Sequence, residues 1–339
     1  MPPKAEPKKV NIALLAVYMA LWYTLNVQYN LYNKKILNAF PYPYMVSLSQ
    51  LASGLVYILP IWILGLGGRT FPSSFSAPSM GLLGAFHGSG HFATVISLGA
   101  GSVAFANVVK AAEPFCSVLM GVLMTGSFPP LMEMLALAPI IAGVMVASMA
   151  EPEFSQTAFI FAMSSNLLFA ARGTLAKTIM SGGPGTKKIG GADVFALNTI
   201  FALIIMTPVA FYMEGAVIQD AWKKYATGSK AIDFSALVNG ELDTKLSPSP
   251  EYFAAYLLVC GLYYYTYNEM AFMVLDLLDP VGQAVGNTVK RVVIIIAGTI
   301  VFNKPLTQQG ILGSGIAIGG VLLYSLVKAN AGSAKAKKA

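Results

Sequence analysis

Apolar stretches of membrane-spanning length follow one another along almost the whole chain. A helix that crosses the hydrocarbon core of a bilayer needs about 20 mostly apolar residues, and here only short polar breaks separate such stretches. Of the 339 residues, 56% are hydrophobic and only 11% are charged, whereas a soluble domain carries about 25% charged residues. The sequence therefore predicts an all-α, polytopic membrane protein and leaves no room for a soluble catalytic domain.

Glycine, proline and charged residues divide the apolar sequence into about ten transmembrane helices. Residues 214–250 form the one long break, which we expect to be a loop with an interfacial helix. The ends of the chain, 1–9 and 329–339, are predicted to be basic tails, and the second of them to be disordered. The predicted spans are 10–32, 43–66, 79–100, 103–126, 130–149, 155–180, 192–213, 251–275, 280–302 and 306–328.

A short internal repeat divides these spans into two halves. The motif Asn-Val-Val-Lys at 107–110 in the fourth span matches Asn-Thr-Val-Lys at 287–290 in the ninth, 180 residues later. We therefore predict one five-helix half over 10–150 and a second over 155–328. Because five is an odd number, the second half would enter the membrane from the opposite face, which is the inverted-repeat plan of many secondary carriers.

Some cations fall inside predicted spans, where charge is costly. Lys110 and Lys290 start more than ~10 Å below the membrane interface by helical rise, and Arg291 follows Lys290 directly. A cation at the centre of a spanning helix costs about 2.5 to 3.5 kcal/mol on insertion scales. Such residues require a buried acidic partner, an aqueous cavity or an anionic substrate.

Internal ion pairing is the alternative to substrate binding. The candidate acids are Glu113, three residues after Lys110, and Glu269 in the eighth span. Arg172 and Lys177 add cations within or at the end of the sixth span, so embedded cations outnumber embedded acids. We therefore favour an anionic substrate over pure ion pairing. Lysines suit a phosphate as point charges, and a guanidinium offers its oxygens a planar, bidentate fork.

Several other kinds of site are not expected. His87 and His91 share one face of the third span with Thr94, but no third ligand lies near them, so we expect neither a metal nor a cofactor. Cys116 and Cys260 lie in separate apolar spans and indicate neither a disulfide framework nor a metal site. The net charge of +7 comes without a basic stripe interleaved with aromatic residues, so we expect no nucleic-acid partner.

Four motifs carry a resemblance to a known family. They are Gly-His at 90–91 with Thr94, Val-Lys-Ala-Ala-Glu-Pro-Phe at 109–115, Tyr-Asn at 267–268 and Val-Gly-Asn-Thr-Val-Lys-Arg-Val at 285–292. Together they resemble the plastidic phosphate translocators, of the drug/metabolite transporter superfamily. The resemblance extends over essentially the whole chain, and the Gly-Asn-x-x-Lys-Arg element is quite specific. Cys116 is a departure, since the family usually has an aromatic residue there.

This resemblance implies an antiporter rather than an enzyme. It implies ten helices in two inverted halves and the exchange of inorganic phosphate for triose phosphate, 3-phosphoglycerate or a related sugar phosphate. By the same resemblance, Lys110, Lys290 and Arg291 would hold the phosphoryl group. The protein would lie in the plastid envelope or in an outer membrane of a complex plastid.

Four further contacts are implied by the resemblance alone. Thr94 and Tyr267 would contact the phosphate or the remainder of the substrate. His91 would favour a three-carbon substrate with a terminal phosphate, and Arg172 would be an auxiliary cation in the cavity.

Alternative functions stay open at this point. Phosphoenolpyruvate, another sugar phosphate or a nucleotide sugar are the alternative cargoes of such a carrier. A membrane-embedded enzyme acting on phosphorylated substrates would need a general base or nucleophile, and no carboxylate pair, Ser/His/Asp set or metal cluster accompanies the two histidines. Because one chain contains both halves of its own site, we expect it to function in the bilayer as a monomer.

Overall fold

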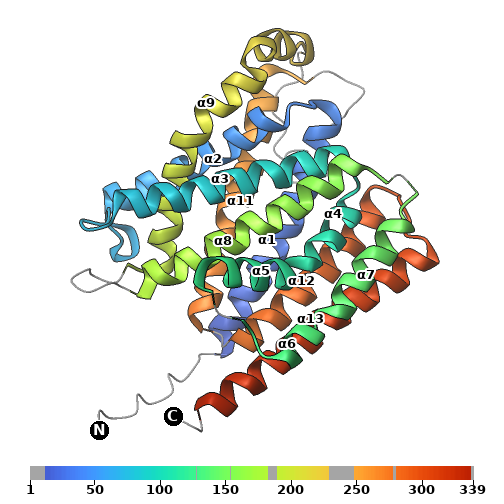
Figure 1. Ribbon diagram of the computed structural model, residues 1–339. Helices are drawn as coiled ribbons and strands as arrows, with labels where there is room; N and C mark the ends of the chain where they lie inside the picture. The colour runs from blue at the N-terminus through green and yellow to red at the C-terminus, as the bar shows by residue number, and fades with distance from the viewer. Residues whose placement is uncertain are drawn as a thin grey trace.

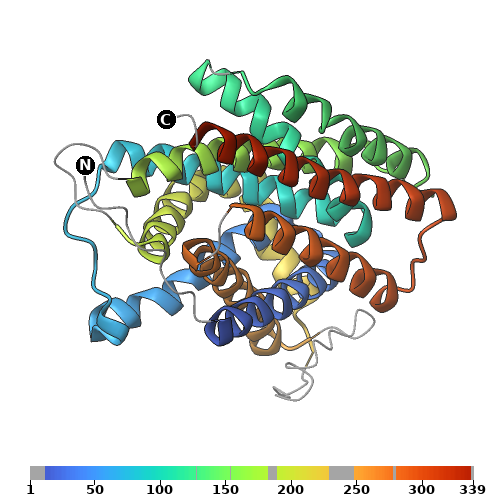
Figure 2. The same ribbon diagram turned by 90° about the horizontal axis from the view of Figure 1, so that it is seen from below.

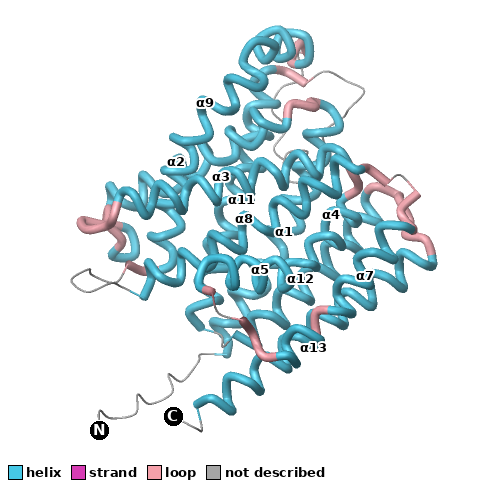
Figure 3. The backbone as a smooth tube through the Cα atoms, in the orientation of Figure 1, coloured by secondary structure: helices cyan, strands magenta, loops and turns pink. Residues whose placement is uncertain are grey.

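The computed structural model describes residues 12–126, 128–152, 154–181, 189–228, 248–277 and 280–336. Every regular element within these ranges is a helix (Figure 3), which confirms the predicted all-α class. The α-helices, labelled in Figure 1, are α1 (Ile12–Ala39), α2 (Pro43–Leu64), α3 (Ala77–Ala100), α4 (Val103–Val109), α5 (Glu113–Thr125), α6 (Leu131–Leu135), α7 (Ala138–Met149), α8 (Gln156–Ser181), α9 (Gly191–Tyr225), α11 (Pro250–Leu277), α12 (Pro280–Val301) and α13 (Gln308–Ala336).

Prolines interrupt two of the predicted spans. A 3-10 turn at Lys110–Ala112 separates α4 from α5, and a short turn separates α6 from α7. Each break lies within four residues before a proline, Pro114 or Pro139, whose nitrogen cannot donate a hydrogen bond to the preceding turn and whose ring crowds it. If each broken pair counts as one unit, the described residues contain ten helical units that correspond to the ten predicted spans.

Hydropathy alone does not identify all of these units as spans. Among the described residues, six stretches are long and apolar enough to cross a membrane, namely α2, α4 with α5, α6 with α7, α8, α9 and α13. The other four units, α1, α3, α11 and α12, have 22 to 28 residues, which is also sufficient length. None of the four meets the requirements of length, hydropathy and low charge that the six stretches meet. α12, for example, contains Lys290 and Arg291.

The packing partners of the helices follow a two-fold pattern. If each unit is replaced by the unit five places away in the chain, the most extensive helix contacts map onto one another. The contact of α3 with α8, for example, maps onto that of α11 with α1. In the same way α3 packs on α9 as α2 packs on α11, and α5 on α8 as α1 on α12. Three pairs, α2 with α9, α4 with α12 and α7 with α13, are their own counterparts. Two related five-helix halves would produce this pattern. The limits of the halves, 10–150 and 155–328, stay a prediction.

Both ends of the described chain lie at one end of the bundle. In the view of Figure 1, α1 begins and α13 ends at the lower end of the molecule. An even number of spans has this consequence. The predicted tail over residues 1–9 lies outside the described residues.

Two helices continue past their predicted ends because aromatic packing continues there. α1 extends to Ala39 rather than 32. α9 extends to Tyr225, so residues 214–225 of the predicted loop with its interfacial helix are a continuation of the seventh span. Trp222 and Tyr225 in the last turns of α9 lie against the rings of Phe40 and Phe253. The remainder of the predicted loop, over 229–247, lies outside the described residues.

The C-terminal tail also differs from its prediction. α13 continues to Ala336, so the prediction of disorder from residue 329 is wrong for most of the tail. Alanine has the highest intrinsic helix propensity, and half of the residues over 329–336 are alanine. The stretch is too polar to span a membrane, but it is well suited to prolong a helix that has already formed.

Glycines allow α7 and α13 to approach one another closely. These two helices lie side by side in Figure 1 and Figure 2. A Cβ added at Gly143 would fall against the backbone nitrogen of Ala317 and 2.6 Å from the carbonyl oxygen of Gly313. Small residues permit such backbone contact between membrane helices. Gly315 and Gly319, also on α13, instead face open space.

We expect Gly143→Val to destabilise the protein and Gly315→Val to leave its stability nearly unchanged. A valine at 143 must push two backbones apart, and overpacking of this kind costs about 1–3 kcal/mol or more. A Cβ added at Gly315 would meet no atom within 4 Å. Thermal unfolding of the two purified variants in the same detergent checks this difference. Equal melting temperatures would contradict the close packing of α7 on α13.

Candidate functional site

Lys110 lies where the fourth unit breaks. It is the first residue of the 3-10 turn between α4 and α5, and it is partly buried. Its Nζ donates a hydrogen bond to the hydroxyl oxygen of Thr94 on α3, at 2.9 Å. The Thr94 hydroxyl in turn donates to the carbonyl oxygen of Gly90, at 2.9 Å, which directs its lone pairs toward the lysine. The structure therefore brings together two of the predicted substrate contacts.

Arg291 pairs with an acid from the other half of the chain. Its Nη2 donates to Oε2 of Glu113, and this ion pair joins α12 to the first turn of α5. The side chain of Arg291 is 9% exposed, and that of Glu113 is 47% exposed. Glu113, a candidate partner for Lys110 by sequence spacing, thus reaches Arg291 instead.

Glu269, the second candidate acid, lies in a different ion-pair cluster. Its Oε1 accepts a hydrogen bond from Nη1 of Arg69 at 2.5 Å, and Arg69 also pairs with Asp193 at 3.0 Å. Trp62 donates its indole N–H to the same Asp193 carboxylate at 3.2 Å. This cluster ties the connection after α2 to α9 and α11. It does not compensate the cations of the predicted site.

Lys290 is held by an amide and an aromatic ring. Its Nζ donates to Oδ1 of Asn287, one turn earlier on α12, at 3.2 Å. The same Nζ lies 4.7 Å from the centre of the ring of Trp22, a buried residue of α1. A ring face attracts a cation through its quadrupole but does not neutralise it. These contacts position the ammonium group of Lys290 and supply no negative charge.

Arg172 is surrounded by rings. Its guanidinium carbon lies 5.0 Å from the ring centre of Phe169 and 5.9 Å from that of Phe272. Nη1 lies 3.0 Å from Nδ1 of His87, the hydrogen-bond acceptor that the structure provides. Nζ of Lys110 lies 5.5 Å from the centre of the same Phe169 ring, so the two cations occupy one region of the protein.

His91 and Tyr267 both pack against Tyr264. The ring centres of His91 and Tyr264 are 4.0 Å apart, and those of Tyr267 and Tyr264 are 5.9 Å apart. His91 is almost completely buried, and its Nε2 has no hydrogen-bond partner among the described residues. Tyr267 is partly exposed and also contacts the ring of Tyr29, at 5.3 Å.

Four cations thus converge from both halves of the chain. The charge of Lys110 is repelled by those of Arg291, Lys290 and Arg172. Over the described ranges, no carboxylate lies within salt-bridge distance of Lys110, Lys290 or Arg172, and Glu113 alone pairs with Arg291. The arrangement suits an anion with several oxygen acceptors. Within the same ranges no group of three or more His, Cys, Asp or Glu residues could hold a metal ion.

Sequence reasoning did not identify the residues that hold these cations. They are Trp22, His87, Phe169, Phe272 and Asn287. Asn287 stands within the repeated motif at 287–290 and within the Gly-Asn-x-x-Lys-Arg element, and these two signals could have identified it. His87 was noted only for the helix face that it shares with His91 and Thr94. The aromatic residues had no signal, because the chain has 19 phenylalanines and 3 tryptophans that are equally apolar.

Known proteins match this chain over most of its length. A sequence profile of the Triose-phosphate Transporter family matches residues 13–325. The triose phosphate/phosphate translocator of Zea mays, a chloroplastic protein, is 35% identical over 331 residues, which cover 98% of this chain and 75% of that protein. The chloroplastic phosphoenolpyruvate/phosphate translocator 1 of Arabidopsis thaliana is 34% identical over 95% of this chain and 73% of that protein.

Two further comparisons extend the picture. The chloroplastic glucose-6-phosphate/phosphate translocator 2 of Arabidopsis thaliana is 32% identical over 96% of this chain and 80% of that protein. A solved crystal structure superposes with a TM-score of 0.50 over 93% of this chain and 97% of that one, and at 14% identity it supports the fold alone.

The profile match covers most of the chain, so the resemblance expected from the motifs is confirmed. The family is one of transporters, which also confirms the expectation of a carrier rather than an enzyme. The chain belongs to the Triose-phosphate Transporter family.

Proposed function

We propose that this protein is an antiporter that exchanges inorganic phosphate for a small phosphorylated metabolite by alternating access. One observation carries the proposal: buried cations from both halves converge, and Glu113 is the one carboxylate that pairs with them among the described residues. The phosphate translocators among the relatives support the same class of substrate.

Lys110, Lys290 and Arg291 are the residues we propose for the phosphoryl group. The two ammonium groups act as point charges, and the guanidinium can bind two oxygens at once. An arginine has five N–H donors, and the structure occupies one nitrogen of Arg291 with Glu113. Thr94, hydrogen-bonded to Lys110, adds a hydroxyl close to the same group.

The remainder of the substrate would contact Arg172, His91 and Tyr267. We propose a three-carbon substrate, triose phosphate or 3-phosphoglycerate, whose second polar end the Arg172 guanidinium binds. The relatives divide between triose phosphate, phosphoenolpyruvate and glucose-6-phosphate translocators, so a panel of these compounds is the appropriate test.

We also propose the location and the working unit. The relatives are chloroplastic proteins, which favours the plastid envelope or an outer membrane of a complex plastid for this carrier. One chain supplies cations from both halves to the site. A monomer is therefore sufficient for transport.

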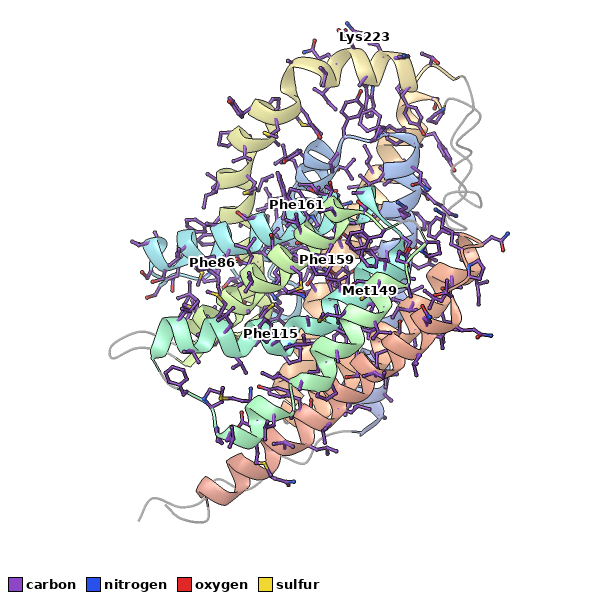
Figure 4. The ribbon with its side chains drawn as sticks, turned by 45° about the vertical axis from the view of Figure 1, so that its right-hand side comes forward. Phe86, Phe115, Met149, Phe159, Phe161 and Lys223 are labelled. Atoms are coloured by element: carbon purple, nitrogen blue, oxygen red, sulfur yellow. The ribbon has the colours of Figure 1, made fainter. Side chains whose placement is uncertain are left out.

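Removing one phosphoryl ligand should abolish or severely weaken exchange. We expect Lys290→Ala and Lys110→Ala to lose about one to two decades of phosphate affinity, because a charge-assisted contact contributes about 1.5–3 kcal/mol. The matched control is Lys223→Ala, an exposed lysine at the far end of α9 (Figure 4). Phosphate/phosphate exchange in proteoliposomes is the measurement. Normal exchange by Lys290→Ala would remove the proposed site.

His91 should affect the preference among substrates more than it affects the affinity for phosphate. We expect His91→Asn to change the ranking among three-carbon substrates, since the imidazole is assigned to the non-phosphoryl end. Labelled phosphate uptake into proteoliposomes preloaded with each counter-substrate measures the ranking. Equal losses for every substrate, phosphate included, would refute this division of roles.

The charge count also predicts strict coupling. Closing an empty site strips water from unpaired cations, at a cost of several kcal/mol per ion, whereas a phosphate with about −1.5 to −2 charge offsets most of it. A ligand shifts a conformational equilibrium by its differential affinity, so the anion favours the occluded state. Return of the empty carrier is then rate-limiting.

We therefore expect proteoliposomes loaded with phosphate to take up labelled phosphate far faster than empty ones, in a one-for-one exchange. No sodium or proton gradient should be required. Equally fast uptake into empty vesicles would contradict the coupling mechanism, even if the binding residues are correct.

A further inference from the structure

His87 joins three helices through both nitrogens of its ring. The residue lies on α3, one turn before His91, and is 1% exposed. Its Nδ1 is 3.0 Å from Nη1 of Arg172 on α8, and its Nε2 is 2.8 Å from the hydroxyl oxygen of Tyr264 on α11. The two contacts connect the first half of the chain to two helices of the second.

The chemistry of these partners determines the tautomer of His87. A guanidinium has only donors, so Nδ1 of His87 must accept the hydrogen bond from Arg172. The neutral ring then carries its proton on Nε2, which donates to the hydroxyl oxygen of Tyr264. A protonated ring would present an N–H to the guanidinium and would break this contact. His87 is therefore a neutral acceptor for as long as it holds Arg172.

This acceptor is what orients the Arg172 guanidinium. The rings of Phe169 and Phe272 attract its charge, but they do not determine where each N–H points. Among the described residues, Nδ1 of His87 is the one hydrogen-bond acceptor of the guanidinium. With Nη1 directed at His87, the other donors of the planar group have a defined direction, because the fork is rigid.

We propose that His87 is a positioning residue for Arg172 and thereby a determinant of substrate selectivity. This inference rests on the proposed function, in which Arg172 binds the non-phosphoryl end of the substrate. Inorganic phosphate has no such end. His87 therefore acts on the affinity for an organophosphate and leaves the affinity for phosphate nearly unchanged.

Two substitutions of His87 distinguish the loss of its hydrogen-bond acceptor from the loss of the volume of its ring. In His87→Asn the amide oxygen takes the place of Nδ1 and still accepts from Arg172. His87→Leu has a similar size without an acceptor. Tyr264→Phe is a third variant, since it removes the other hydrogen bond of His87 and keeps the contact with Arg172.

The measurement is phosphate/phosphate exchange in proteoliposomes with 3-phosphoglycerate as competitor. We expect His87→Leu to weaken competition about tenfold, the loss of one hydrogen bond to a charged group, with less than about a twofold change in the KM for phosphate. His87→Asn should retain most of the competition, and Tyr264→Phe should lose less than His87→Leu. A uniform loss for both ligands, or wild-type competition in His87→Leu, overturns the inference.

A double-mutant cycle tests whether the effect passes through Arg172. In an Arg172→Ala background, His87→Leu should change the competition ratio by less than about twofold, because there is no guanidinium left to orient. An undiminished tenfold effect would mean that His87 acts on the fold and would overturn the proposal. If the wild-type protein shows no phosphate exchange, the proposed function is overturned together with this inference. If exchange is normal and His87→Leu has the same competition ratio as the wild type, this inference alone is overturned.

Discussion

Positive charge held inside the bilayer without equal negative charge is the constraint on which this carrier depends. Lys110, Lys290 and Arg172 lie on the faces of Phe169 and Trp22, and neutral groups accept their hydrogen bonds. Such partners fix the position of a cation and supply no negative charge. An arriving anion therefore need not displace a carboxylate from any of these three residues. Only one cation of the described site has an acidic partner.

The cost of buried charge is also why the centre of the site could be predicted. A lysine or arginine within an apolar span is conspicuous in the sequence, and this identified Lys110, Lys290 and Arg291. The partners of these residues are not conspicuous. Glu113 is three residues from Lys110 and was a candidate partner for it, yet it pairs with Arg291 across 178 residues. Long-range pairing depends on how the two halves pack, and a linear pattern does not contain that information.

The number and order of the helices were also predictable, because spans of mostly apolar residues are conspicuous in the sequence. The ten predicted spans correspond to the ten helical units within the described residues, although only six of these units are apolar enough to be identified by hydropathy alone. The ends of α1, α9 and α13 were not predictable from such runs. Outside the hydrocarbon, a helix ends where its own residues stop favouring it. Aromatic packing extends α9, and alanines extend α13, where hydropathy has already fallen.

The extra length of α9 makes the two ends of the helix bundle unlike each other. At 1.5 Å per residue, its 35 residues measure about 52 Å, whereas the hydrocarbon core is about 30 Å thick. Its counterpart in the first half, α2, has 22 residues and is only as long as the core requires. One end of the bundle is thus covered by the last turns of α9, which bend across it and contain Lys223 and Lys224 (Figure 4). The two halves therefore pack symmetrically inside the bundle, whereas its two ends differ. Each of the two aqueous compartments meets a different surface of the same carrier.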